Sequence, residues 1–191
     1  DAILEKTGWE SIKTADSWGI TPLHLASALN RYSICVFLIC AGADVNARTI
    51  DGFTPLHWAT AKDAARAARV LIDAGADVNA MASAGITPLH WASNKNATNI
   101  VTMLIAAGAD VEARTESGFT PLHWATLKKS VEAARWLAFK IASDQVDQEI
   151  RNDSMIQPAE SGVKQQMTTS EHETEALAAS NPQPAAQFET M

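Results

Sequence analysis

The sequence has few of the features that mark extracellular or membrane-spanning proteins. Its two cysteines, Cys35 and Cys40, lie five residues apart on a predicted helix, so they point to different faces and we expect no disulfide between them. We interpret both as buried, reduced thiols, which suits a cytosolic or nuclear setting. The longest apolar run, residues 34–41, is too short to cross a bilayer, and residues 1–6 do not resemble a signal peptide. We therefore expect an intracellular protein without membrane insertion, in the cytoplasm rather than the nucleus, and keep a secreted effector as an alternative.

Motifs of catalysis and of metal binding are also missing from the sequence. It contains no glycine-rich phosphate loop, no Cys-x-x-Cys and no His-Glu-x-x-His. We expect no enzymatic activity, no metal site and no cofactor within these residues. If the chain is part of a longer protein, a catalytic domain could still lie beyond either end.

Basic clusters are absent as well, and the charge is unevenly distributed. Residues 1–141 hold 13 Lys+Arg and 13 Asp+Glu, whereas residues 142–191 hold 2 and 9, so the net charge of −7 comes from the last part of the chain. Binding to nucleic acid requires clustered Lys and Arg, and we therefore expect none. The last 50 residues are polar, acidic and poor in large apolar side chains, which predicts that most of them are disordered.

One eight-residue phrase dominates what is present. It reads GITPLHLA at 19–26, GFTPLHWA at 52–59, GITPLHWA at 85–92 and GFTPLHWA at 118–125, so its copies are 33 residues apart. A second phrase, Ala-Gly-Ala-Asp-Val, keeps the same interval around Gly42, Gly75 and Gly108. Two phrases with one period indicate a tandem array of structural repeats.

This period and the Thr-Pro-Leu-His-x-Ala motif resemble the ankyrin repeat. The resemblance implies an all-α repeat solenoid of helix-turn-helix units with projecting β-hairpin loops, here called fingers. In such proteins the first helices and the fingers line a concave surface that usually meets partners. The expected divisions are a capping or partial repeat at 1–18, repeats at 19–51, 52–84, 85–117 and, incomplete, 118–141, and an acidic tail at 142–191 with a short helix at 143–151.

Each repeat carries local signals for its helices. The threonine of the motif is a candidate N-cap, the proline suits the first helical position, and the histidine can reach back to the cap, so we interpret the histidines as structural and not as metal ligands. Asn30, Asp63, Asn96 and Lys129 should end the first helices in the left-handed conformation, for which lysine is the poorest fit. Gly42, Gly75 and Gly108 should end the second helices in the same conformation. The motif residues are Thr21, Pro22, His24, Thr54, Pro55, His57, Thr87, Pro88, His90, Thr120, Pro121 and His123.

Apolar residues at offsets of three and four predict one buried face on each second helix. At the N-terminal end of the array we expect Ile3, Leu4 and Trp9 to cover the first repeat, and at the C-terminal end Val146 and Ile150 to cover the fourth. The predicted buried sets are Ile34, Cys35, Phe37, Leu38 and Ile39; Ala67, Ala68, Val70, Leu71 and Ile72; Ile100, Val101, Met103, Leu104 and Ile105; and Ala133, Ala134, Trp136, Leu137 and Ala138.

A Trp-x-x-x-Lys pair recurs in three successive first helices, where residues four apart share a face. One interpretation is structural, because a lysine near the helix end complements the helix dipole and its stem can lie on the tryptophan. The other interpretation is that the tryptophans and lysines form an apolar, cationic ridge that binds an acidic or amphipathic segment of a protein partner. The pairs are Trp58 and Lys62, Trp91 and Lys95, and Trp124 and Lys128; the first repeat has Leu25 and Leu29 instead.

The finger tips form a second set of candidate contact residues, at positions where ankyrin repeats vary. The competing interpretation is that these residues have a structural role only, and Trp18 could equally pack on Trp9. The tip residues are Trp18, Ile50, Asp51, Ser83, Ala84, Glu116 and Ser117.

We therefore expect a monomeric, non-enzymatic adaptor or scaffold that binds a protein partner on its concave face. The acidic tail could compete for the same lysine row by charge complementarity. The alternative function is a regulatory ankyrin segment of a larger enzyme, channel or secreted effector.

Overall fold

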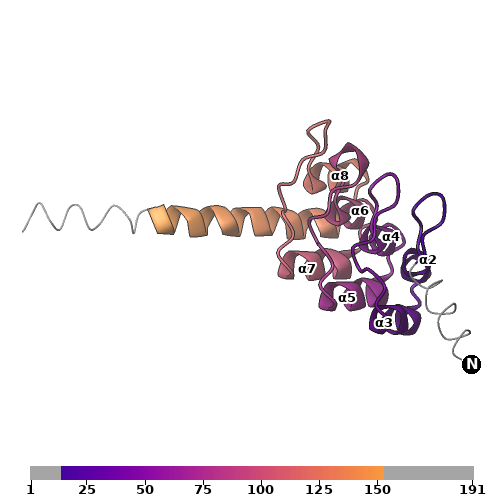
Figure 1. Cartoon of the computed structure of the whole chain (residues 1–191). Coiled ribbons are helices and arrows are strands. Elements are labelled where there is room, and N and C mark those ends of the chain that lie inside the picture. The colour runs from indigo at the N-terminus through magenta and orange to yellow at the C-terminus, as the bar shows by residue number, and fades with distance from the viewer. Residues whose placement is uncertain (1–13, 153–191) are drawn as a thin grey trace, which may run out of the picture. The chain divides into compact units, whose positions relative to one another are not determined.

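The computed structural model describes residues 14–152. Figure 1 shows helices in two rows, and within each row every helix packs on the next. None of residues 14–152 forms a β-strand, so the expected all-α solenoid is confirmed. The first helices are α2 (Pro22–Ala28), α4 (Pro55–Ala61), α6 (Pro88–Asn94) and α8 (Pro121–Leu127), the second helices are α3 (Tyr32–Cys40), α5 (Ala65–Asp73) and α7 (Thr98–Ala106), and residues 131–152 are also helical.

The motif histidines cap their own helices and also join neighbouring repeats. In repeat two, the Thr54 N–H donates to His57 Nδ1 (3.1 Å), and His57 Nε2 lies 3.1 Å from the carbonyl oxygen of Ile86 in the next repeat. Because Nδ1 accepts and a carbonyl can only accept, the proton must be on Nε2, and the imidazole is neutral. The equivalent links join His24 to Phe53 O (3.0 Å) and His90 to Phe119 O (3.1 Å). The capping role is as predicted, whereas the link between repeats is not visible in the sequence.

Burial fixes this neutral form. The pKa of His57 is lowered from 6.5 to about 4, mainly by loss of hydration in the interior; nearby Arg48 contributes to the lowering, and the Ile86 carbonyl opposes it. Burial also lowers the pKa values of His24 and His90. His123 makes the same cap contact with Thr120 (3.1 Å), but its side chain is exposed at the end of the series.

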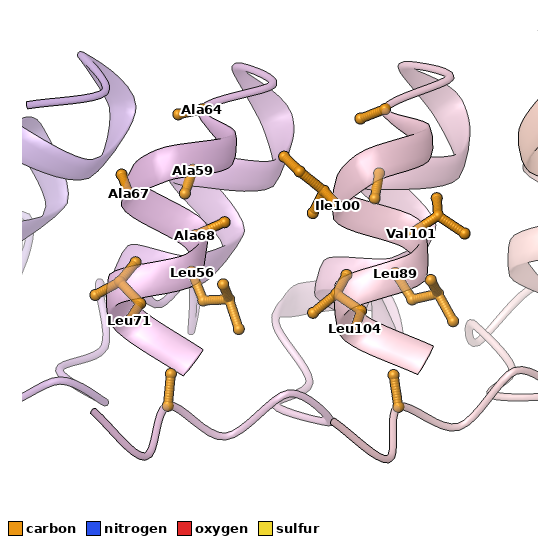
Figure 2. Packing of buried hydrophobic residues seen from close by; sticks show 14 of the residues in the cluster. Leu56, Ala59, Ala64, Ala67, Ala68, Leu71, Leu89, Ile100, Val101 and Leu104 are labelled. Atoms are coloured by element: carbon orange, nitrogen blue, oxygen red, sulfur yellow. The ribbon is translucent and has the colours of Figure 1, made fainter. Parts of the chain in front are cut away.

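The core consists of leucines and alanines that repeat with the motif. Leu56 and Ala59 of α4 pack with Ala67, Ala68 and Leu71 of α5, and all five are fully buried (Figure 2). In the next repeat Leu89 takes the place of Leu56, and Ile100, Val101 and Leu104 are the buried residues of α7. Replacing a fully buried leucine with alanine costs about 2–5 kcal/mol. Alanines allow the helices to lie close together, and therefore successive repeats share one continuous core.

The turns within each repeat are left-handed, as predicted. Asn30, Asp63, Asn96 and Lys129 have φ angles of 53°, 53°, 55° and 58°. The Asn96 side chain gains a bond there, because its Oδ1 accepts from the N–H of Ala133, and Asn30 accepts in the same way from Ala67 (both 3.1 Å). Lys129 has the strained backbone without such a bond.

Gly42, Gly75 and Gly108 end the second helices with φ of 85° to 87°, which confirms the predicted caps. A Cβ at Gly75 would meet nothing within 4 Å, so the backbone angle and not crowding requires glycine there. Beyond the cap, Asn46 Oδ1 accepts from the N–H of Asp77 in the next repeat (2.8 Å), and Asn79 accepts likewise from Asp110 (2.8 Å).

Two expectations about the second helices are wrong at the ends of the array. Ile34 and Phe37 of α3 are 48% and 54% exposed, Trp136 is 45% exposed and Ala138 is also exposed, because within residues 14–143 another repeat packs on only one side of each of these helices. Cys35 is buried as expected, but Cys40 is exposed because it lies on the opposite side of α3. The proposed N-terminal cover, Ile3, Leu4 and Trp9, lies outside the described residues.

Residues 144–152 belong to a second unit that begins at Asp144. They are helical, and this includes most of the short helix expected at 143–151. Val146 and Ile150 are 53% and 59% exposed, and their capping role stays a prediction. The rest of the acidic tail lies outside the described residues.

We predict that Lys129→Gly stabilises the protein by about 0.5–1 kcal/mol, since glycine adopts positive φ without the steric cost that lysine bears. Urea unfolding followed by circular dichroism measures the change. The matched control is Asn96→Gly, at the same backbone angle, which should be destabilising because it removes the bond to Ala133. An increase in stability in both variants would contradict the stabilising role of the bond between Asn96 and Ala133.

We also predict that stability falls as the pH drops from about 6.5 towards 4. The unfolded chain protonates His57 near its ordinary pKa, whereas the folded protein resists protonation until about pH 4, so the unfolded state binds more protons in this interval. The loss from His57 should be roughly 3 kcal/mol. Urea unfolding at pH 7.5 and pH 4 measures it.

In the His57→Gln variant the loss over this pH range should be smaller, although the variant should be less stable at pH 7.5 because it lacks the link to Ile86. His123→Gln is the control, since His123 has an exposed side chain. Equal destabilisation by the two substitutions at pH 7.5 would contradict the importance of the inter-repeat bond.

Candidate functional site

An apolar groove lies on the face formed by the first helices and the fingers, here called the first-helix face. Its volume is about 410 Å³, and it is lined by Phe53, His57, Trp58, Ala61, Lys62 and Trp91. Three of these residues, Trp58, Lys62 and Trp91, belong to the predicted Trp/Lys ridge. The structure therefore brings side chains of two successive repeats into one groove.

The tryptophans of the ridge are half-buried and packed edge to face. Trp91 and Trp124 have ring centroids 5.7 Å apart at an interplanar angle of 82°. Trp58 packs on His24 (5.6 Å) and Trp124 on His90 (5.5 Å), each time on the histidine of the preceding repeat. Two of the three ridge tryptophans therefore pack on histidines that are themselves bonded to the next repeat.

The lysines of the ridge mark the ends of the first helices. Lys62, Lys95 and Lys128 are the C-cap residues of α4, α6 and α8, and all three are exposed. This position suits the helix dipole and also leaves each ammonium group accessible to a partner. Within residues 14–152, none of these three ammonium groups makes a cation–π contact with a tryptophan ring. Because His57 is neutral, Lys62 supplies the positive charge of the groove.

The indole N–H of Trp91 is a buried donor that has no acceptor among the described residues. Such a group loses its hydration and costs about 1–3 kcal/mol when it is left unpaired. Among the residues that the structure describes, no other buried side-chain donor lacks a hydrogen-bond partner.

The finger tips form a second row, which is joined by backbone hydrogen bonds between neighbouring fingers. The Ile50 N–H donates to the Trp18 carbonyl (3.0 Å), the Ser83 N–H to Asp51 (2.8 Å) and the Glu116 N–H to Ala84 (2.9 Å). The side chains of Trp18 and Ile50 are 62% and 64% exposed at adjacent tips. Six of the seven predicted tip residues therefore stand side by side in pairs, and Ser117 is the exception.

Ala84 differs from the other tip residues because its φ is 62°. An alanine in the left-handed conformation costs about 1–2 kcal/mol, and no feature of the sequence indicates it. Phe53 and Ala61 were not predicted as site residues. The recurrence of phenylalanine at positions 53 and 119 of the repeated motif was an available signal for the first, and nothing in the sequence indicated the second.

Residues 14–152 contain no group of three or more His, Cys, Asp or Glu side chains arranged to hold a metal ion. In the same range, no helix combines the length and the apolar character that crossing a membrane requires. The four motif histidines bond to their N-cap threonines, and His24, His57 and His90 also bond to the next repeat.

Two fungal proteins, both named palmitoyltransferase akr1, are similar to a short part of the chain. The protein from Emericella nidulans is 59% identical over 34 residues, which are 18% of this chain and 5% of that protein. The protein from Aspergillus oryzae is 58% identical over 33 residues, which are 17% of this chain and 4% of that protein. The chain thus matches only about one repeat length of these much longer relatives.

A family model described as ankyrin repeats (3 copies) matches residues 2–82 and 79–149, which is most of the sequence. The two rows of helices, the capped Thr-Pro-Leu-His turns and the projecting fingers agree with this match. The chain therefore belongs to the ankyrin-repeat family, whose repeats are protein-interaction modules.

Proposed function

We propose that the chain is a non-enzymatic, monomeric adaptor or scaffold that holds a protein partner on its first-helix face. The observation that carries the proposal is the groove between Trp58 and Trp91, which offers apolar walls and the Lys62 ammonium group on one surface. Tryptophan is enriched among residues that dominate binding energy.

The chemistry of the groove favours an amphipathic segment with acidic residues. An apolar side chain of the partner would lie between the two indoles, and a carboxylate would pair with Lys62 or Lys95. The unpaired N–H of Trp91 gives further support, because a small movement of the indole would let it donate to a carbonyl or carboxylate of the partner. The exposed tips Trp18, Ile50, Asp51, Ala84 and Glu116 would extend the contact along the fingers.

A second candidate function is that of a regulatory ankyrin segment in a larger enzyme. The observation that favours it is the local similarity to two proteins named as palmitoyltransferases, of which the matched parts are 5% and 4%. The coding sequence on both sides of Asp1 and Met191 tests it. A start codon directly before and a stop codon directly after these residues would exclude this candidate.

We predict that Trp91→Ala with Lys95→Glu lowers affinity for the partner by about tenfold or more, because a hot-spot indole and a cation are removed together. The partner is first identified by affinity capture with the full chain from extracts of cells that express it. Binding of the purified partner is then measured by isothermal titration calorimetry.

The matched control is Leu25→Ala with Leu29→Glu, at the equivalent positions of repeat one, outside the groove. Helical circular dichroism confirms that each variant is folded. A further variant, Lys62→Glu with Lys95→Glu, alters exposed side chains alone and should also weaken binding. Unchanged affinity of this folded variant would contradict the role of the lysines.

A further inference from the structure

A second groove lies on the opposite row of helices, here called the second-helix face. One hollow of about 640 Å³ is lined by Tyr32, Ala65, Arg66, Arg69, Val70, Asn99 and Met103, which come from α3, α5 and α7. A neighbouring hollow shares Arg69 and Met103 with it and continues to Ala106 and Ala107 at the end of α7. The two hollows therefore form one groove along α5 and α7.

The groove is cationic, because its lining holds two arginines and no acidic residue. Arg66 and Arg69 are exposed and lie three residues apart on α5, so they share one face of that helix. Neither guanidinium is within 4.0 Å of a carboxylate oxygen in the part of the chain that the structure describes. Asp73 is the one acidic residue within α3, α5 and α7.

Contact with Tyr32 holds the Arg66 side chain in place before any ligand binds. Its guanidinium carbon lies 5.5 Å from the centre of the Tyr32 ring. A guanidinium held over an aromatic face keeps its N–H edge free to form two parallel bonds to a carboxylate. Val70 and Met103 supply half-buried apolar surface next to it.

We propose that this second-helix groove binds an acidic peptide segment of a protein partner. Carboxylates of the segment pair with Arg66 and Arg69, and an apolar side chain between them lies on Val70 and Met103. Nucleic acid is a poor match, because two arginines neutralise few phosphates and the chain as a whole carries a net charge of −7. The site is separate from the first-helix groove and does not depend on the function proposed there.

The test uses the full chain and a fluorescein-labelled peptide in which one leucine is flanked by glutamates. Fluorescence anisotropy gives its Kd, and the same peptide with glutamine in place of glutamate is the probe control. We expect the glutamate probe to bind at least tenfold more tightly than the glutamine probe, and its affinity to fall as salt is added. Equal binding of the two probes, or no binding, would overturn the proposal.

Arg66→Gln with Arg69→Gln should raise the Kd of the glutamate probe at least tenfold when both are measured in a Lys62→Glu, Lys95→Glu background, in which the first-helix groove no longer attracts the probe. The matched control, Arg114→Gln with Lys129→Gln, changes the net charge by the same amount at exposed positions outside both grooves and should leave the Kd within about twofold. Equal effects of the two double substitutions would show that the probe senses only net charge, and this would refute the site.

Asn99→Glu tests the groove with both arginines retained. It places a carboxylate at the rim, in the first turn of α7, where negative charge favours the helix. The Kd should rise a few-fold because the new carboxylate competes for the guanidinium groups. An unchanged Kd in this variant, or a marked preference for a phosphoserine version of the probe, would contradict the proposed carboxylate recognition.

Discussion

The hydrogen bonds of the buried motif histidines are the interaction on which the array depends. Each imidazole accepts from the N–H of its own N-cap threonine and donates to a carbonyl of the next repeat, so one side chain fixes both the start of a helix and the distance to its neighbour. A charged imidazole could not accept at Nδ1, and burial keeps the ring neutral. The rings of His24 and His90 also pack against Trp58 and Trp124, so this link helps to position the tryptophans of the first-helix face.

The shared core explains why binding features gather on the faces of the array. Leucine and alanine side chains fill the space between the rows, so the core holds few polar groups beyond the capping histidines and neighbouring hydroxyls. Side chains that vary between repeats are left on the first-helix face, the second-helix face and the finger tips. The two grooves differ in chemistry for this reason: tryptophan and lysine line one, and arginine beside tyrosine and methionine lines the other.

The repeat pattern predicts much of the local structure, including the N-cap threonines, the left-handed turns at Asn30 and Lys129, and the glycine caps, because each follows from a short stretch of chain. It fails where the environment is set by distant residues. Ile34 and Phe37 carry the same apolar pattern as their buried counterparts, yet they are exposed because, within residues 14–143, α3 packs mainly on α2 and α5. Offsets along a helix report which residues share a face but not whether another helix covers that face.

The sequence by itself determined the repeat unit, its helices and its family, since period, caps and turn residues are local properties. It also singled out Trp58, Lys62 and Trp91 through their regular spacing. Only the tertiary structure decided that these three meet Phe53 and Ala61 in one groove, that His57 bonds to Ile86, and that Arg66 lies over Tyr32. The physical reason is that these contacts join residues about 30 positions apart, and their geometry is set by the stacking of whole repeats.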